Sequence, residues 1–282
     1  GRGGLDYAPC RYGNSKLVFR GPRRSLAGDY VACLGGTETF GKFTPQPYPA
    51  RLEDRIGAAC VNLGVVNAGV DALVNDAAVL DAAAGARLAI LQVMGAQNLS
   101  NRFYSVHPRR NDRFLRPSPL MTSLFSEVDF TDFHFTRHML STLSDCGAER
   151  FAMLREEMRT AWVARMRTLI ERIGAPVLLL WFAGHAPDAS AEDATDAQAP
   201  EPLFVTRKMI DALRPAVADV VVAVPSAAAR GEGTEGMVFA ETEAAAASGL
   251  PGPRAHAEAA ETLAPAVRAL LARRTPAQER RQ

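Results

Sequence analysis

The sequence predicts an α/β protein: a three-layer α/β/α sandwich around a mostly parallel sheet of about five strands. Three observations predict this class. Short apolar runs alternate with helix-like stretches along the chain, as they do in parallel sheets. The runs are continuously apolar, which is typical of strands covered on both faces. The 282 residues are 48% hydrophobic, so the chain can bury a large core.

The elements follow one another in a regular order. The expected strands are Tyr30–Leu34, Cys60–Val66, Leu88–Met94, Val177–Phe182 and Val220–Val224. The expected helices are Pro49–Gly57, Val70–Ala84, Arg150–Ile173, Lys208–Ala216 and Ala255–Arg273. In sheets of this kind ligands bind beyond the carboxyl ends of the strands. The segments that follow the strands are therefore the places to look for a functional site.

Two segments interrupt the alternation. Residues 98–147 contain no clear strand and are rich in Arg, Phe and His; an insertion of this length after a strand end favours a functional lid. Residues 187–202 are acidic with no basic residue, which indicates a mobile loop without a catalytic role. We expect one domain over residues 1–282 that carries these two additions.

Charge and cysteine usage exclude several classes of protein. The 32 basic and 31 acidic side chains nearly cancel, so no overall field draws the chain to nucleic acid or to a membrane surface. The longest apolar run, Val177–Ala183, is far shorter than the ~20 residues of a membrane span. The four cysteines form no Cys-x-x-Cys pair, which favours reduced thiols. We expect a cytoplasmic protein with no cofactor, no nucleic-acid partner and no membrane partner; its oligomeric state stays open.

Polar motifs follow the strand ends. Gly35-Gly36-Thr37-Glu38-Thr39 comes after the first expected strand, and its glycine pair permits a sharp turn and close approach by a ligand. Asn62-Leu63-Gly64, continuing to Gly69, belongs to the second strand end. Gly95-Ala96-Gln97-Asn98 follows the third strand, and Pro253-Arg254-Ala255-His256 opens the last helix.

The order and spacing of these four blocks resemble the GDSL, or SGNH, hydrolase family over most of the chain. The resemblance puts Thr37 in the place of the nucleophilic serine and Gly36 in the place of the aspartate beside it. It implies an SGNH-like fold and an esterase, deacetylase or acyl transferase that acts on a polar or glycan-linked ester.

The same resemblance implies roles for the other blocks. A hydroxyl nucleophile needs a base, donors for the oxyanion and an acid that orients the base. His256 would be the base, and the Gly64 N–H with the side-chain amide of Gln97 or Asn98 would hold the oxyanion. The chain departs from the family in two ways: threonine is a bulkier, β-branched nucleophile, and Pro253 stands where the family has the orienting acid.

A second resemblance carries no activity. Its residues lie in Cys10-Arg11-Tyr12-Gly13-Asn14-Ser15, Phe19–Arg24, Gly35–Gly41 and Val106–Phe114. Together these motifs are similar to an uncharacterised alphaproteobacterial family of unknown function, over most of residues 6–182.

Arginine and aromatic residues are interleaved in residues 11–24 and 102–116. Arginine forks beside aromatic rings suit phosphate, sulfate, carboxylate or sugar ligands, although such arginines also pair with acids elsewhere in a neutral protein. We therefore expect a small-molecule or glycan ligand at the cleft, bound by Arg11, Arg20, Arg23, Arg102, His107, Arg109, Arg110 and Arg113. The alternative to an enzyme is a noncatalytic protein that binds a carbohydrate or an anion in the same cleft.

A metal site is conceivable at His134 and His138, which are four residues apart and would share one helix face. Asp129 and Asp132 lie just upstream. No third ligand has a recognisable spacing, so packing or hydrogen bonding is the favoured interpretation and no metal is expected.

Overall fold

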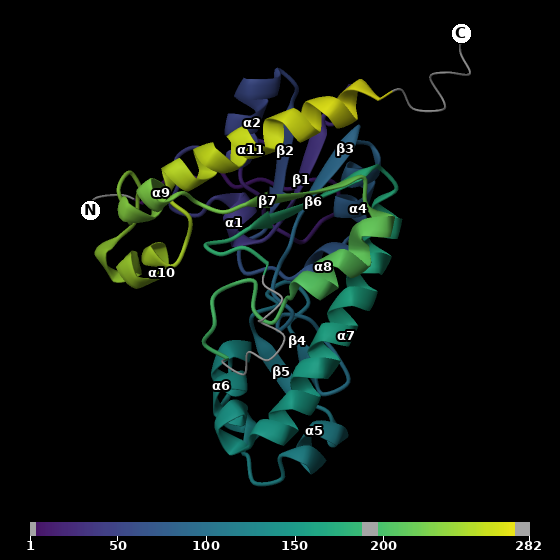
Figure 1. Cartoon of the computed structure of the whole chain (residues 1–282), viewed down its shortest axis with the longest axis vertical. Coiled ribbons are helices and arrows are strands. Elements are labelled where there is room, and N and C mark those ends of the chain that lie inside the picture. The colour runs from purple at the N-terminus through teal and green to yellow at the C-terminus, as the bar shows by residue number, and fades with distance from the viewer. Residues whose placement is uncertain (1–3, 188–196, 274–282) are drawn as a thin grey trace.

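The computed structural model describes residues 4–187 and 197–273, and it confirms the predicted fold class (Figure 1). Five parallel strands form one sheet in the order β2-β1-β3-β6-β7. They are β1 (Val31–Gly35), β2 (Cys60–Gly64), β3 (Leu88–Gln92), β6 (Val177–Phe182) and β7 (Asp219–Ala223). Each lies within two residues of an expected strand at both ends.

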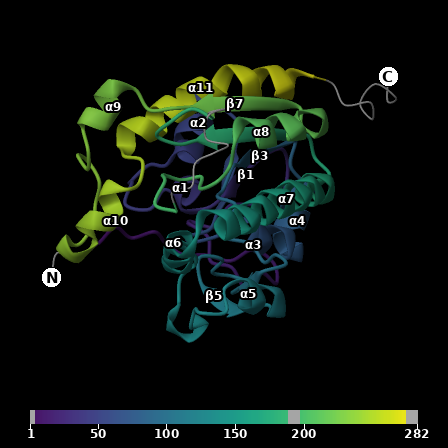
Figure 2. The same cartoon turned by 60° about the horizontal axis from the view of Figure 1, so that its bottom comes forward.

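Helices cover both faces of the sheet, which is why its strands are continuously apolar. Val31 and Cys33 face α2 (Tyr48–Ile56) and α11 (Pro253–Ala272). The alternate residues Ala32 and Leu34 belong to the larger core on the other face. Figure 2 shows α11 and α7 on opposite sides of the strands. The second layer of helices consists of α3 (Val70–Val74), α4 (Ala77–Ala84), α7 (Ala148–Ile173) and α8 (Arg207–Leu213).

The register of the first three strands brings their carboxyl ends to one edge. Gly35 of β1 lies beside Gly64 of β2, and Leu34 lies beside Leu91 of β3. The short helix α1 (Thr37–Phe40) starts two residues after β1. Residues that follow these strands therefore converge at the start of α1.

The expected helix over residues 70–84 is two helices. Asp76 separates α3 from α4, because its Oδ1 accepts the N–H of Val79 at 2.9 Å and caps α4. Its Oδ2 accepts the hydroxyl of Ser15 at 2.7 Å. The expected helix 208–216 ends as α8 at Leu213 and continues as a 3₁₀ turn over Arg214–Ala216.

The insertion at residues 98–147, in which the sequence shows no clear strand, contains two short strands. An antiparallel pair, β4 (Tyr104–Val106) and β5 (Phe114–Pro117), is followed by α5 (Pro119–Leu124), a 3₁₀ turn (Phe130–Asp132) and α6 (Thr136–Cys146). The strands have three and four residues, too few to give a clear pattern. The 26 residues of α7 span about 39 Å, so α7 reaches from the sheet to α6 (Figure 1).

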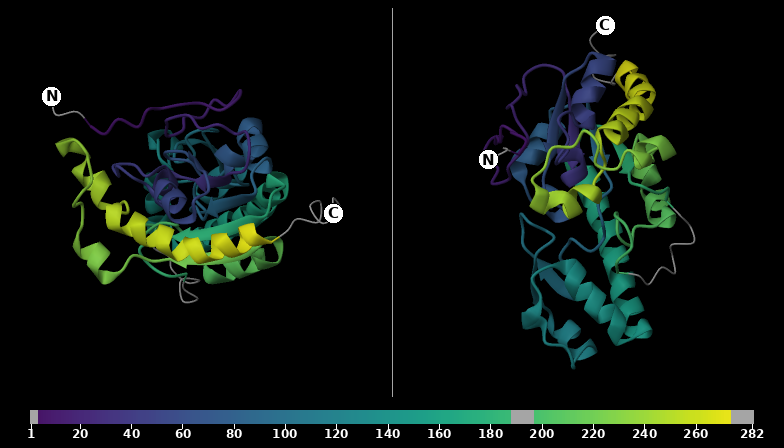
Figure 3. Two further views of the ribbon diagram at one scale, coloured as in Figure 1. Left: turned by 90° about the horizontal axis from the view of Figure 1, so that it is seen from above. Right: turned by 90° about the vertical axis from the view of Figure 1, so that its left-hand side faces the viewer.

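The remaining elements lie near the start of α11. They are α9 (Ala227–Gly231), a 3₁₀ turn (Glu241–Glu243) and α10 (Ala244–Ser248), and Figure 3 shows them projecting from one end of the molecule. Most of the predicted acidic loop, residues 188–196, lies outside the described residues. Within the described ranges every helix is too short or too polar to cross a bilayer.

A buried asparagine ties the insertion to the sheet domain. Asn111 is fully buried. Its Oδ1 accepts the N–H groups of Gly69 and Ala72, at 2.8 and 2.9 Å, and its Nδ2 donates to the carbonyl of His107 at 2.9 Å. One side chain thus provides hydrogen-bond partners for backbone groups at the start of α3 and in the loop after β4.

Asn111→Ala removes these bonds and leaves buried N–H groups without an acceptor. The free energy of unfolding is expected to fall by about 2 kcal/mol, measured by urea denaturation. The exposed Asn14→Ala variant is the control and should change it by less than about 0.5 kcal/mol. Equal values for the two variants would contradict this account of Asn111.

Candidate functional site

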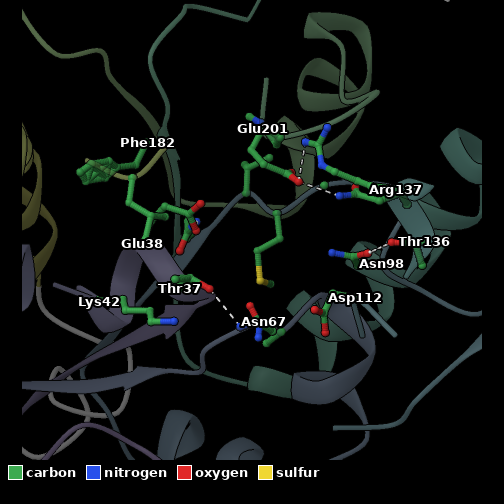
Figure 4. Close-up of a pocket in the computed structure, with 18 of the residues that line it drawn as sticks. Thr37, Glu38, Lys42, Asn67, Asn98, Asp112, Thr136, Arg137, Phe182 and Glu201 are labelled. Carbon is green, nitrogen blue, oxygen red and sulfur yellow. Dashed lines mark hydrogen bonds and ion pairs between the residues drawn. The ribbon is translucent and has the colours of Figure 1, made fainter. Parts of the chain in front are cut away.

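A cavity of about 440 Å³ opens at the carboxyl ends of β1 and β3 (Figure 4). This volume lies in the range of small-molecule sites. The lining comes from the strand ends, from the insertion and from segments near the C-terminus. Its polar and charged residues are Thr37, Glu38, Lys42, Asn67, Gln92, Gln97, Asn98, Asp112, Thr136, Arg137 and Glu201.

Gln92, the last residue of β3, fixes the first turn of α1. Its Oε1 accepts the N–H groups of Gly36 and Thr39, at 3.0 and 3.2 Å, and the Thr39 hydroxyl at 2.6 Å. Its Nε2 donates to Glu38 at 2.8 Å. A Cβ at Gly35 would collide with Gln92 Oε1 and with the Thr39 hydroxyl. The glycine at this strand end is therefore required for the close approach of Gln92.

Thr37 is the first residue of α1, and its side chain faces the cavity (Figure 4). Its Oγ1 accepts the backbone N–H of Asn67 at 2.9 Å. Asn67 has a φ of 59°, a left-handed conformation that asparagine adopts more readily than most residues. The bond orients the Thr37 oxygen while its proton remains available to an acceptor in the cavity.

Glu38 is a carboxylic acid whose pKa is raised. Burial raises the pKa of Glu38 above its ordinary value, the nearby Glu201 carboxylate raises it further, and the hydrogen bond from Gln92 partly opposes both effects. A carboxyl group with a raised pKa exchanges its proton closer to neutral pH than an ordinary glutamate. Glu38 therefore suits a proton-transfer role.

Glu201 lies across the cavity from α1. Its carboxylate accepts hydrogen bonds from Arg137 at 2.8 Å, from Gln97 Nε2 at 2.7 Å and from the N–H of Leu203 at 3.0 Å. The composition of residues 187–202 predicts a mobile acidic loop without a catalytic role. Glu201, in this segment, lines the cavity. Its acidic neighbours in the sequence gave no sign that one of them would be held there.

The insertion supplies the opposite wall. Asn98 Oδ1 accepts the hydroxyl of Thr136 at 2.7 Å, which leaves the Asn98 amino group toward the cavity (Figure 4). Asp112 Oδ1 is buried without a hydrogen-bond partner. Burial raises the pKa of Asp112, although the positive charges of Arg110 and Arg113 partly lower it. The wall thus presents an amide donor and a carboxyl group that has one oxygen buried without a hydrogen-bond partner.

Three of the five residues predicted to be catalytic, Thr37, Gln97 and Asn98, line this cavity, and Gly64 does not. The Gly64 N–H donates to Asn62 Oδ1 at 2.9 Å, and a Cβ at Gly64 would collide with the backbone of Phe40. Gly64 is thus a packing glycine under α1. The N–H that reaches Thr37 belongs to Asn67, three residues later.

His256 is the fifth, and it also lies outside the cavity lining. It is fully buried where α11 packs on α2; its Nδ1 accepts the N–H of Tyr48 at 2.9 Å, and its ring lies 5.1 Å from that of Phe182. Burial lowers the pKa of His256 to about 3, and Arg20 and Arg51 contribute. His256 faces the core because it shares the buried side of α11 with Ala255 and Ala259. The geometry gives it no contact with Thr37.

The predicted binding residues do not assemble at the cavity; none of the eight belongs to its lining. Arg20 donates to the carbonyls of Phe40, Gly41 and Pro45, at 3.2, 2.7 and 2.9 Å. Arg11 bonds to the Ser15 carbonyl, and Arg102 pairs with Glu157 at 3.8 Å. His107 Nδ1 accepts the N–H groups of Arg109 and Arg110. The charges of Arg110 and Arg113 act on Asp112, and the Arg113 guanidinium also lies over the ring of Phe135, which lines the cavity. Arg23 lies outside the lining.

Within the described residues no group of three or more His, Cys, Asp or Glu side chains is placed to hold a metal ion. His134 and His138 are exposed. The His138 ring packs edge-on against Phe133, with the centroids 5.1 Å apart. This contact fits the packing interpretation for His138.

The buried imidazole predicts acid sensitivity. The folded His256 has a pKa of about 3 and the unfolded side chain about 6.5. Between these values only the unfolded chain binds the proton, so the free energy of unfolding falls as pH drops from 6.5 toward 3. His256→Gln should show a weaker fall over that window in urea titrations. The exposed His138→Gln variant should follow the wild type; identical curves for both variants would contradict the assignment.

Comparisons with known proteins place the chain in a family. The lipase Lip_vut3 from a goat rumen metagenome is similar in structure, with 12% identity, a TM-score of 0.42, and coverage of 86% of this chain and 97% of that chain. No curated protein matches the sequence. A family model described as a domain of unknown function, DUF6473, matches residues 1–271. The chain belongs to the DUF6473 family.

Proposed function

We propose that the protein is an ester hydrolase or acyl transferase whose nucleophile is Thr37. One observation carries the proposal: the Thr37 hydroxyl enters a cavity beside a carboxyl group of raised pKa, Glu38, while it accepts the Asn67 N–H. A hydroxyl, a proton acceptor and a fixed N–H donor are the parts that acyl transfer needs.

Glu38 replaces His256 as the base in this proposal. The ionised Glu38 carboxylate takes the Thr37 proton while Thr37 Oγ1 forms a bond to the ester carbonyl carbon. The bond from that carbon to the alcohol oxygen then breaks, and the alcohol leaves with the proton from Glu38. Water, or a second hydroxyl compound, then attacks the carbonyl carbon of the acyl-Thr37 ester and gives its proton to Glu38. The bond from that carbon to Thr37 Oγ1 breaks, Glu38 returns the proton to Oγ1, and the acid or the new ester is released.

Two donors suit the negative charge that develops on the carbonyl oxygen. The Asn67 N–H lies 2.9 Å from the attacking oxygen, so it can also reach an oxygen on the attacked carbon. The Asn98 amino group faces the same cavity. Donors fixed before the reaction stabilise the oxyanion without reorganising.

The lining fits an ester with an apolar acyl group and a polar alcohol. Most lining residues are polar, but Phe182, Ala246 and Leu250 form an apolar part. An apolar wall suits the acyl group, and the polar residues suit the alcohol. Deacetylation of a polar or glycan-linked ester fits this division.

A noncatalytic carbohydrate- or anion-binding protein is the second candidate. It is favoured by the fact that the cavity residues, within the described chain, include no histidine. Carboxylates are weaker bases than imidazole, which makes the cavity less suited to proton transfer. A binding protein needs no base.

Substitutions in α1 test the proposed enzymatic activity. Turnover of short-chain acyl esters should persist or rise in Thr37→Ser, because the methyl group that restricts the rotamer is lost. Thr37→Val keeps the shape without the hydroxyl and should abolish covalent turnover. Glu38→Gln should lower kcat by about 10²-fold or more and remove the rise of wild-type activity with pH through the raised pKa of Glu38.

The exposed Thr122→Val variant in α5 is the matched control and should keep wild-type turnover. Wild-type activity that survives in Thr37→Val would eliminate Thr37 as the nucleophile. Turnover in none of the proteins, Thr37→Ser included, would favour the binding protein.

A further inference from the structure

The cavity has two unlike sides, with Thr37 between them. Figure 4 shows Phe182 on one side of Thr37 and Asn98, Asp112 and Thr136 on the other. The insertion therefore provides a surface of its own, which we call the insertion wall: Asn98, Asp112, Phe135 and Thr136. An ester that reacts at Thr37 with its acyl group toward Phe182 would place its alcohol on this wall.

Two side chains on the polar side of the cavity have hydrogen-bond acceptors without a donor. Asp112 Oδ1 and Gln97 Oε1 are buried, have no hydrogen-bond partner, and belong to side chains that line the cavity. A buried acceptor without a donor costs about 1–3 kcal/mol. Hydroxyl groups on a ligand would supply donors to these two side chains, and the Asn98 amino group would donate in return. The wall is thus complementary to a compound with several hydroxyls.

An exposed ring adds an apolar surface. Phe135 lines the cavity although 46% of the residue is exposed. The Arg113 guanidinium carbon lies 5.8 Å from its ring centroid, which helps to hold the ring in place. A flat apolar ring beside hydrogen-bonding groups suits a cyclic ligand with one apolar face and polar edges.

The charges favour a neutral ligand. Arg137 is paired with Glu201, so its charge is compensated. Lys42 lies near Thr37 and Asn67, away from the insertion wall (Figure 4). Although burial raises the pKa of Asp112, Arg110 and Arg113 lower it, so the ionised Asp112 carboxylate opposes their charge. An anionic group on the wall would lie beside that carboxylate and would be repelled by it.

We propose that the alcohol moiety of the substrate is a neutral sugar ring, held on the insertion wall between Phe135 and Asp112. This inference rests on the proposed function, because it names the alcohol of that ester, but the subsite can be tested without turnover. The ring would stack on Phe135, and its hydroxyls would donate to the Asp112 carboxyl group and accept from the Asn98 amino group.

The test uses the full chain carrying Thr37→Val, so that binding is measured without reaction. Calorimetry compares methyl glycosides of glucose, galactose, mannose, xylose and N-acetylglucosamine with glucuronate and galacturonate. At least one neutral glycoside should bind, and more tightly than the uronates. Adding Phe135→Ala or Asp112→Asn should weaken that binding by about ten-fold or more.

Leu115→Ala and Asp132→Asn are matched controls, since both residues are exposed on the insertion and outside the cavity lining; they should leave binding unchanged. Binding of no neutral glycoside, tighter binding of the uronates, or equal binding in Phe135→Ala and Asp112→Asn would overturn the inference. Sugar binding without any ester turnover would keep the subsite and reject the enzyme. Ester turnover without sugar binding would keep the enzyme and reject the sugar subsite.

Discussion

The side-chain amide of Gln92 is the interaction on which the candidate site depends. It joins the end of the central strand β3 to the first turn of α1, because its oxygen accepts three hydrogen bonds there and its nitrogen holds Glu38. The parallel register of β1 and β3 brings the two strand ends together. Without this anchor a helix of four residues would have little to fix it. The positions of Thr37 and Glu38 therefore follow from a strand far away in the sequence.

The same constraint explains which parts of the site could be predicted from sequence patterns. Apolar runs and turn residues indicated all five strands, and the glycine pair before Thr37 indicated where the first strand would turn into a functional segment. Gln92, Glu201 and Asp112 were not singled out as site residues. The roles of Gln92 and Glu201 depend on contacts between residues about 50 to 100 positions apart, Gln92 with Glu38 and Glu201 with Gln97. No local pattern encodes such contacts.

Two motif positions have structural roles where the resemblance implied catalytic ones. Gly64 lets α1 pack against β2, and His256 fills the core where α11 meets α2. In each case the spacing of the motif is retained while the side chain or N–H is already engaged within the fold. The absence of an acid at Pro253 is consistent with this, because a buried histidine that accepts the Tyr48 N–H needs no orienting carboxylate. The chemistry proposed here moves to Glu38, Asn67 and Asn98 around the same hydroxyl.

The most direct test of this account is to trap the acyl group on the protein. Wild-type protein is mixed with an activated acetyl ester, quenched in acid within the first turnover, digested and mapped by mass spectrometry. We expect one acetyl group on the peptide that contains Thr37, at the threonine oxygen, and none at that position in Thr37→Val. An acetyl group found instead on Lys42, or ester turnover with no acetylated Thr37 at any time point, would contradict it.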